Sequence, residues 1–183
     1  MKTLVIHPQD KSTVFLKGIY ELIPEEDKTV LVTGATDKEI RELIQSHDRV
    51  MMMGHGSPHG LFSVGGFKGK SPYLINKTHV ELLNEKEDNV FIWCNADMFV
   101  TFYDLKGFYT GMFISEVGEA YYCGLPGTSQ DLVEESNYGF TNILKNFVNE
   151  GKDVTYENVK REYGLLAENN PVAYYNYLRL YKR

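Results

Sequence analysis

Short runs of apolar residues alternate along this chain with longer stretches in which apolar residues recur every three or four positions. The short runs are typical of buried strands, and the longer stretches are typical of helices that pack one face on a sheet. Strands are predicted at residues 3–7, 29–33, 49–53, 89–93 and 109–114. Helices are predicted at residues 12–23, after Asp37, after Thr78, and at residues 98–105, 116–122, 129–149 and 156–167.

Capping residues and breakers set the predicted helix boundaries. Ser12 or Thr13 is expected to cap the first helix, which Pro24 ends, and Asp37 and Thr78 are expected to cap the next two. The glycine-rich passage 54–71 is predicted to be mostly loop, with a hairpin at 61–64. The tyrosine-rich segment 171–181 fits either a strand or a helix.

The alternation of strands and helices predicts one α/β domain over residues 1–183. Such a pattern is typical of a three-layer α/β/α sandwich with a mostly parallel central sheet. In sheets of this kind, functional sites form beyond the carboxyl ends of the strands. Residues that directly follow the predicted strands are therefore the first candidates for a site.

Charge and cysteine content narrow the classes of function. A net charge of −6 and a pI near 5.4 argue against nucleic acid as a partner, because phosphate binding needs a basic face. No apolar run approaches a membrane span, and the N-terminal residues do not resemble a signal peptide. The two cysteines, Cys94 and Cys123, are expected to be reduced thiols. We therefore expect a cytoplasmic protein with no membrane contact.

Two short motifs carry the candidate chemistry. Gly54-His55-Gly56 follows the apolar run of the third predicted strand, and Trp93-Cys94-Asn95 ends the fourth. If these two strands are parallel neighbours, their tips lie about 5 Å apart. The imidazole of His55 and the thiol of Cys94 would then face one substrate.

A thiol and an imidazole at this spacing suit acyl transfer. The thiolate is the nucleophile, and a neighbouring imidazole takes the thiol proton. The oxyanion that develops needs hydrogen-bond donors, for which the N–H of Gly56 and that of Cys94 or Asn95 are candidates. Residues around these motifs and after the fifth strand are expected to bind the substrate: Gly54, Ser57, His59, Asn95, Asp97 and Glu116.

A strand that ends in His-Gly, followed by a later strand that ends in Cys, resembles the caspase-like fold of clan CD cysteine peptidases. This group includes caspases, legumain, separase, gingipains and CHAT domains. The resemblance covers residues 1 to about 120 and implies that His55 is the general base, Cys94 the nucleophile and Gly56 an oxyanion donor. It also implies a peptide or protein substrate and no metal or organic cofactor.

The chain departs from this family at two positions. Trp93 stands directly before the cysteine, where the family usually has a small residue. Ile92 stands where members that cleave after Lys or Arg often carry an acidic residue. Asp97, Glu116 or Glu119 are the alternative sources of negative charge for a substrate pocket.

Two other functions stay open from the residues alone. The stretch 115–120 faintly resembles a segment of nucleoside deoxyribosyltransferases, in which a glutamate attacks the sugar; Glu116 or Glu119 would take that role. A non-catalytic caspase-like binding module is the other alternative, and Trp93 favours it.

Metal and nucleotide sites are weaker hypotheses. His55 and His59 have the spacing of some zinc ligands, but the surrounding glycines and proline forbid the helix that such sites use. The loop also lacks the spacing of a phosphate-binding loop. The clustered tyrosines fit core packing or a homo-oligomer interface, namely Tyr121, Tyr122, Tyr174, Tyr175 and Tyr177.

Overall fold

Six strands form a mostly parallel central sheet in the computed structural model, which describes residues 1–67, 71–149 and 156–183. Their spatial order is β2-β1-β3-β7-β8-β9, and the last strand is antiparallel to its neighbour. The strands are β1 (Thr3–Ile6), β2 (Lys28–Leu31), β3 (Arg49–Met53), β7 (Asn89–Ile92), β8 (Gly107–Thr110) and β9 (Leu180–Lys182). The five parallel strands thus follow the order 2-1-3-4-5, in which the crevice between the first and third strands is the usual ligand site.

Side chains that alternate along the central strands build two cores. Val5, Met51 and Met53 face one side of the sheet, whereas Leu4 and Met52 face the other. All five are fully buried. Because both faces are covered, these strands carry consecutive apolar residues rather than one at every second position.

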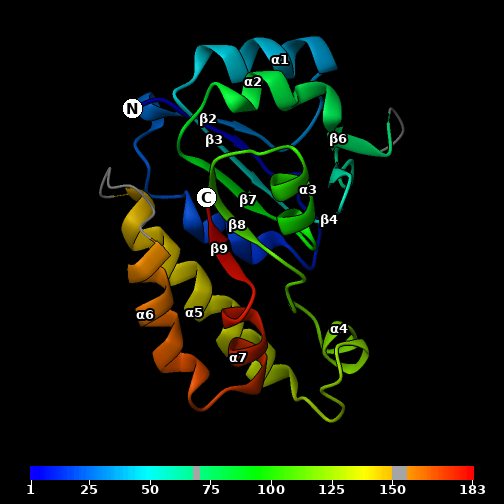
Figure 1. The fold of residues 1–183 in the computed structure, drawn as a ribbon, viewed down its shortest axis with the longest axis vertical. Coiled ribbons are helices and arrows are strands. Elements are labelled where there is room, and N and C mark those ends of the chain that lie inside the picture. The colour runs from blue at the N-terminus through cyan, green and yellow to red at the C-terminus, as the bar shows by residue number, and fades with distance from the viewer. Residues whose placement is uncertain (68–70, 150–155) are drawn as a thin grey trace.

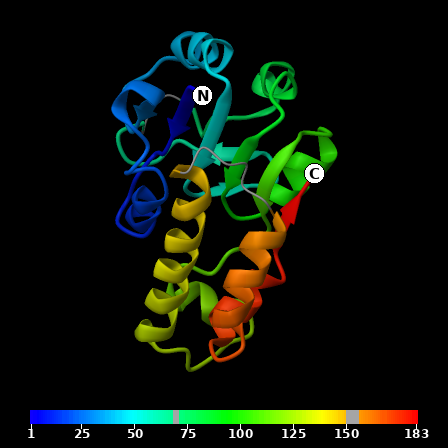
Figure 2. The same cartoon turned by 90° about the vertical axis from the view of Figure 1, so that its left-hand side faces the viewer.

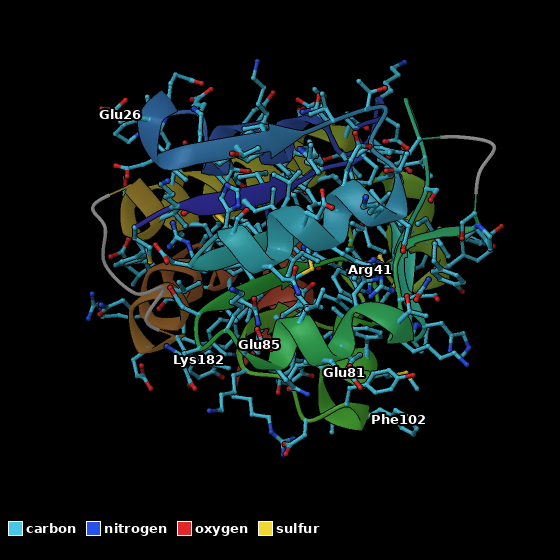
Figure 3. All side chains as sticks on the ribbon, turned by 90° about the horizontal axis from the view of Figure 1, so that it is seen from above. Glu26, Arg41, Glu81, Glu85, Phe102 and Lys182 are labelled. Atoms are coloured by element: carbon cyan, nitrogen blue, oxygen red, sulfur yellow. The ribbon has the colours of Figure 1, made fainter. Side chains whose placement is uncertain are left out.

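Helices cover both faces of the sheet, as the alternation of elements predicts (Figure 1). One face carries α1 (Asp37–Ser46), α2 (Val80–Asn84) and α3 (Ala96–Phe102); α1 and α2 lie side by side across it (Figure 3). The other face carries the 3₁₀ helix η1 (Val14–Ile19), α5 (Gln130–Asn149) and α6 (Tyr156–Ala167). Figure 2 shows α5 and α6 running alongside each other past the end of the sheet.

Two short helices and a small sheet complete the described elements. Helices α4 (Val117–Tyr122) and α7 (Pro171–Tyr177) pack with the first half of α5 in a third apolar cluster. The small sheet joins β4 (Gly56–Ser57), β5 (Gly60–Phe62) and β6 (Tyr73–Ile75) in antiparallel order. The remaining 3₁₀ turns are η2 (Glu25–Asp27) and η3 (Lys77–His79). In the described parts of the chain, no helix combines the length and hydropathy needed to cross a membrane.

Several predicted boundaries need correction. The first predicted helix is the shorter 3₁₀ helix η1. Thr13 is its N-cap residue, as predicted, but no side chain makes a capping bond, because the hydroxyls of Ser12 and Thr13 bond to Asp10 instead. Thr36 rather than Asp37 caps α1, since its hydroxyl and the Glu39 carboxylate form a capping box.

The remaining corrections concern the loops and the C-terminus. Asn76 rather than Thr78 supplies the cap before α2. The hairpin predicted at 61–64 instead pairs β4 with β5, between residues 56 and 62. The segment 171–181 divides into a helix, α7, and the start of a strand, β9.

Candidate active site

His55 and Cys94 lie at the same edge of the central sheet. Strands β3 and β7 are parallel neighbours, with Met53 opposite Ile92, so the residues that follow them emerge side by side. Both His55 and Cys94 line one small hollow of about 20 Å³. Its walls are mostly apolar and come from η1, β7 and the segment after β8: Leu16, Ile92, Phe113 and their neighbours. The topology thus brings the two predicted catalytic side chains to one place.

A carboxylate holds the imidazole of His55. Asp10 Oδ2 lies 2.9 Å from His55 Nε2, and Ser12 Oγ lies 2.8 Å from the same nitrogen. The Ser12 hydroxyl donates to the other carboxylate oxygen, Asp10 Oδ1, at 2.9 Å. Because an ionised carboxylate can only accept, this network assigns the proton of a neutral imidazole to Nε2. The lone pair then resides on Nδ1, which has no hydrogen-bond partner among the described residues.

Asp10 is a functional candidate that the sequence analysis did not identify. It follows β1, the strand next to β3, so it stands across the sheet's switch point from His55. Its Oδ1 also accepts from the N–H groups of Ser12 and Thr13 and from the Thr13 hydroxyl. Partial burial raises the pKa of this carboxyl, but the bonds from Ser12 and Thr13 and the adjacent His55 outweigh burial and hold the pKa below its usual range.

The thiol of Cys94 is in a resting arrangement. Burial raises the pKa of Cys94 to about 11, against a smaller lowering by its bond to Phe113. The Sγ atom donates to the Phe113 carbonyl oxygen at 3.6 Å. Within the described residues, no hydrogen bond joins Cys94 to His55. Cys94 is therefore protonated near neutral pH and turned toward the segment after β8.

The backbone turns sharply directly after the cysteine. Asn95 adopts a left-handed conformation, with φ of 65°, between β7 and α3. Asn tolerates this region better than most residues. The turn holds Cys94 at the very tip of β7.

Trp93 ties the cysteine strand to the histidine loop. Its indole N–H donates to the Ser57 carbonyl oxygen at 3.1 Å, and the ring is buried against Gly56. A Cβ on Gly56 would lie 2.2 Å from the indole Cδ1, so only glycine fits there. The Thr110 hydroxyl donates to the Trp93 carbonyl oxygen from the neighbouring strand β8. Trp93, the large residue before the cysteine, therefore packs against the histidine loop and holds it beside the end of β7.

A much larger cleft of about 580 Å³ adjoins this hollow. The two share Phe15 and Ser115 as lining residues. Its lining residues come from the loop after β1, from η1, from the start of α4 and from the first half of α5. Its volume is in the range of ordinary ligand sites. A substrate could therefore occupy the cleft with its reacting bond at the hollow.

The two glutamates of the glycosidic alternative differ in their surroundings. Glu116 is exposed and lines the large cleft. Glu119 instead closes the first turn of α4, since its Oε2 accepts from the N–H and hydroxyl of Ser115 and from the N–H of Glu116. Glu116 is thus the glutamate that faces a ligand-sized space.

The other predicted site residues lie around the hollow rather than in it, apart from Gly54. Gly54 lines the hollow, with φ of 143°, and its N–H donates to the Ile92 carbonyl oxygen. Ser57 bonds to the Tyr73 hydroxyl, and His59 is exposed at the tip of the β4–β5 turn. Gly56, Ser57, His59, Asn95 and Asp97 line neither the hollow nor the large cleft.

Neither a metal-binding cluster nor a comparison with known proteins identifies the function of this site. Among the described residues, no group of three or more His, Cys, Asp or Glu side chains is placed to hold a metal ion. Comparison with protein-family models, with curated proteins and with solved structures gives no match for this chain. The functional argument therefore depends on the geometry of the site.

Proposed function

We propose that this protein is a cysteine-dependent hydrolase of the caspase-like kind that acts on a peptide or amide carbonyl. The observation that carries the proposal is the line of Asp10, His55 and Cys94 across three neighbouring strand ends. Asp10 holds one ring nitrogen of His55, which leaves the other nitrogen as a base beside the hollow that Cys94 also lines. A nucleophile, a base and a group that orients the base are the parts that cysteine catalysis requires.

In the first step, the Cys94 thiol turns from the Phe113 carbonyl toward His55. Nδ1 takes the thiol proton as sulfur attacks the substrate carbonyl carbon, and the C=O electron pair moves onto oxygen. The tetrahedral intermediate then collapses, the C–N bond breaks and His55 gives its proton to the leaving amine. Asp10 stabilises the positive charge that the ring carries between these two transfers.

In the second step, water replaces the amine. His55 takes a proton from a water molecule as the water oxygen attacks the thioester carbon of the acyl-enzyme. The carbon–sulfur bond breaks, and the proton returns to the Cys94 sulfur. The acid product leaves and the resting thiol is restored.

The backbone near Gly56 supports a role in binding the oxyanion. The bond from the Phe62 N–H to the His55 carbonyl makes Gly56 and Leu61 a non-hydrogen-bonded pair of the β4–β5 ladder. The N–H of Gly56 therefore points away from β5. Such an N–H can donate to a substrate oxygen without breaking the small sheet.

The raised pKa of Cys94 specifies how this dyad works. A thiol with a pKa of about 11 is not part of a preformed thiolate–imidazolium pair. His55 acts instead as a general base during the attack. Both cysteines are free, and a reducing compartment such as the cytoplasm would keep them so.

An amide library tests this function. Peptides bearing a fluorogenic amine at their C-terminus, with every amino acid at the residue before the amine, are incubated with the wild-type chain. We expect release from at least one member, and its loss in Cys94→Ala and in His55→Ala. Cys123→Ser is the matched control and keeps the activity. Release that persists in Cys94→Ala would contradict the proposal.

A glycosidic function is the second candidate, since Glu116 lines the large cleft. It predicts release of free base from a nucleoside panel, lost in Glu116→Gln and kept in Cys94→Ala. Release of the fluorogenic amine from the amide library, lost in Cys94→Ala, together with no release of free base from the nucleoside panel, favours the hydrolase. Inactivity of the wild-type chain on both panels would favour a binding module.

A further inference from the structure

The hollow that His55 and Cys94 share is small and mostly apolar. One water molecule needs a cavity of about 10 to 15 Å³. The hollow of about 20 Å³ therefore has room for one group of that size, such as a methyl group. Leu16, Ile92 and Phe113 form much of its wall, and no titratable side chain of the described residues lines it besides His55 and Cys94. A charged side chain placed there would lose its water without gaining an ionic partner.

The apolar wall of the hollow belongs to the core of the protein. Leu16, Ile92 and Phe113 are each at most 5% exposed and lie in the same apolar cluster. The Phe113 ring also packs on the Phe140 ring of α5, with 4.7 Å between the ring centres. Because a close-packed interior resists a change of volume, a group larger than the hollow would have to displace these side chains. By contrast, Phe15 is only partly buried, and it lines both the hollow and the large cleft.

We propose that the hollow is a specificity pocket for alanine or glycine on the acyl side of the amide that Cys94 attacks. The side chain of that residue is attached to the carbon next to the reacting carbonyl, so it enters the space around Cys94 and His55. A methyl group fills this space and buries apolar surface, whereas the hydrogen of glycine leaves it partly empty. The rest of the substrate has room in the adjoining cleft of about 580 Å³. The inference rests on the proposed function and names its substrate class.

Relative rates across the amide library test this proposal. We expect the highest kcat/KM with alanine before the fluorogenic amine, and a value about three to ten times lower with glycine. With valine, leucine, phenylalanine, aspartate or arginine, kcat/KM should be lower than with alanine by at least about tenfold, because one methylene group too many already costs that much in a tight apolar pocket. Any of these five members with a kcat/KM within tenfold of the alanine member would overturn the proposal.

Substitutions in the wall locate the pocket. Phe15→Ala opens the hollow toward the cleft, and should raise kcat/KM for the leucine member relative to the alanine member by at least about tenfold. Ile92→Val removes one methylene group with little disturbance of the core, and should raise the same ratio by a smaller factor. Each ratio is measured within one protein, so a loss of folded protein cancels.

Leu22→Ala is the control, because Leu22 is an exposed apolar residue that lines neither the hollow nor the large cleft. Its ratio should equal that of the wild-type chain. A ratio that is unchanged in both wall variants, or raised equally in Leu22→Ala, would overturn the assignment of the hollow as the pocket.

The two proposals fail in different ways. Release that depends on Cys94 and His55 but is fastest after a large or charged residue removes the pocket assignment and leaves the cysteine chemistry intact. No release from any member, or release that persists in Cys94→Ala, removes both.

Discussion

The indole ring of Trp93 occupies the space that a Cβ on Gly56 would need. A Cβ at that position would lie 2.2 Å from the ring and 2.7 Å from the Gly60 carbonyl oxygen. Trp93 directly precedes the proposed nucleophile, and Gly56 directly follows the proposed base. Their contact therefore fixes the two catalytic segments against each other, which explains why a large residue is accommodated before Cys94.

Substitution at this contact should destabilise the fold. Gly56→Ala is expected to lower the free energy of unfolding by about 1 to 3 kcal/mol, because the added methyl group clashes with the buried Trp93 ring and the Gly60 backbone. Gly118→Ala is the control: no described atom lies within 4 Å of a Cβ there, and α4 gains about 0.5 to 1 kcal/mol from the better helix former. Urea unfolding measures both. Equal effects of the two substitutions would show that the Trp93 contact is unimportant.

The pairing of Asp10 with His55 should matter for turnover more than for substrate binding. Asp10→Asn is expected to lower kcat by about 10²-fold to 10⁴-fold, because the amide no longer stabilises the charged ring or fixes its tautomer. KM should change little. Thr13→Ala is the control, since it removes the two hydrogen bonds between the Thr13 hydroxyl and Asp10 without removing a bond to His55. A loss in Thr13→Ala as large as that in Asp10→Asn would reduce Asp10 to a structural role.

Alkylation of the resting thiol should depend steeply on pH. In a Cys123→Ser background, the rate of reaction with iodoacetamide is expected to rise about tenfold per pH unit from pH 7 to pH 10, because burial raises the pKa of Cys94 to about 11. Intact mass against time gives the rate. A plateau below pH 8 would instead indicate a preformed thiolate and contradict the general-base mechanism.

A buried histidine should make the fold sensitive to acid. Burial lowers the pKa of His7 to about 4, and its Nε2 is buried without a partner among the described residues. Between pH 6.5 and pH 4 the unfolded chain therefore binds more protons at this residue, and stability falls as the pH falls. The His7 contribution to this loss is about 2 kcal/mol between pH 7 and pH 5.

His7→Gln isolates that contribution. Urea unfolding at pH 7 and at pH 5 should show a smaller difference for the variant than for the wild-type chain, by about 2 kcal/mol. An identical difference in the two proteins would show that His7 is not kept neutral by the fold.

The sequence predicts the layers better than the details of the loops. The strand at residues 49–53 and the helix at residues 156–167 have the predicted bounds. Their apolar residues are the ones that the fold buries, so the hydrophobic pattern alone shows where these elements lie. The segment 171–181 was ambiguous since a helix and a strand follow each other within it. The sequence analysis places the cap of α1 at Asp37, one residue too late, although Thr36 and Glu39 have the spacing of a capping box.

The site shows a similar division. The sequence places His55 and Cys94 at one edge, because Cys94 directly follows an apolar run and His55 follows another with only Gly54 between. Asp10 was missed because its role depends on β1 lying between β2 and β3, and strand order is set by tertiary packing. Asn137 and Glu134 come from a helix far along the chain, so the cleft they line has no local signature.

Covalent labelling tests the pairing of Cys94 with His55 most directly. A panel of dipeptidyl fluoromethyl ketones, one for each side chain next to the ketone, is reacted with the chain, and the adduct is mapped by mass spectrometry. We predict that at least one member modifies Cys94, and that this reaction is at least tenfold slower in His55→Ala. The rate in His59→Ala should equal that of the wild-type chain, because His59 is exposed on the β4–β5 turn. Labelling of Cys94 at an unchanged rate in His55→Ala, or no labelling of Cys94 by any member, would contradict the account.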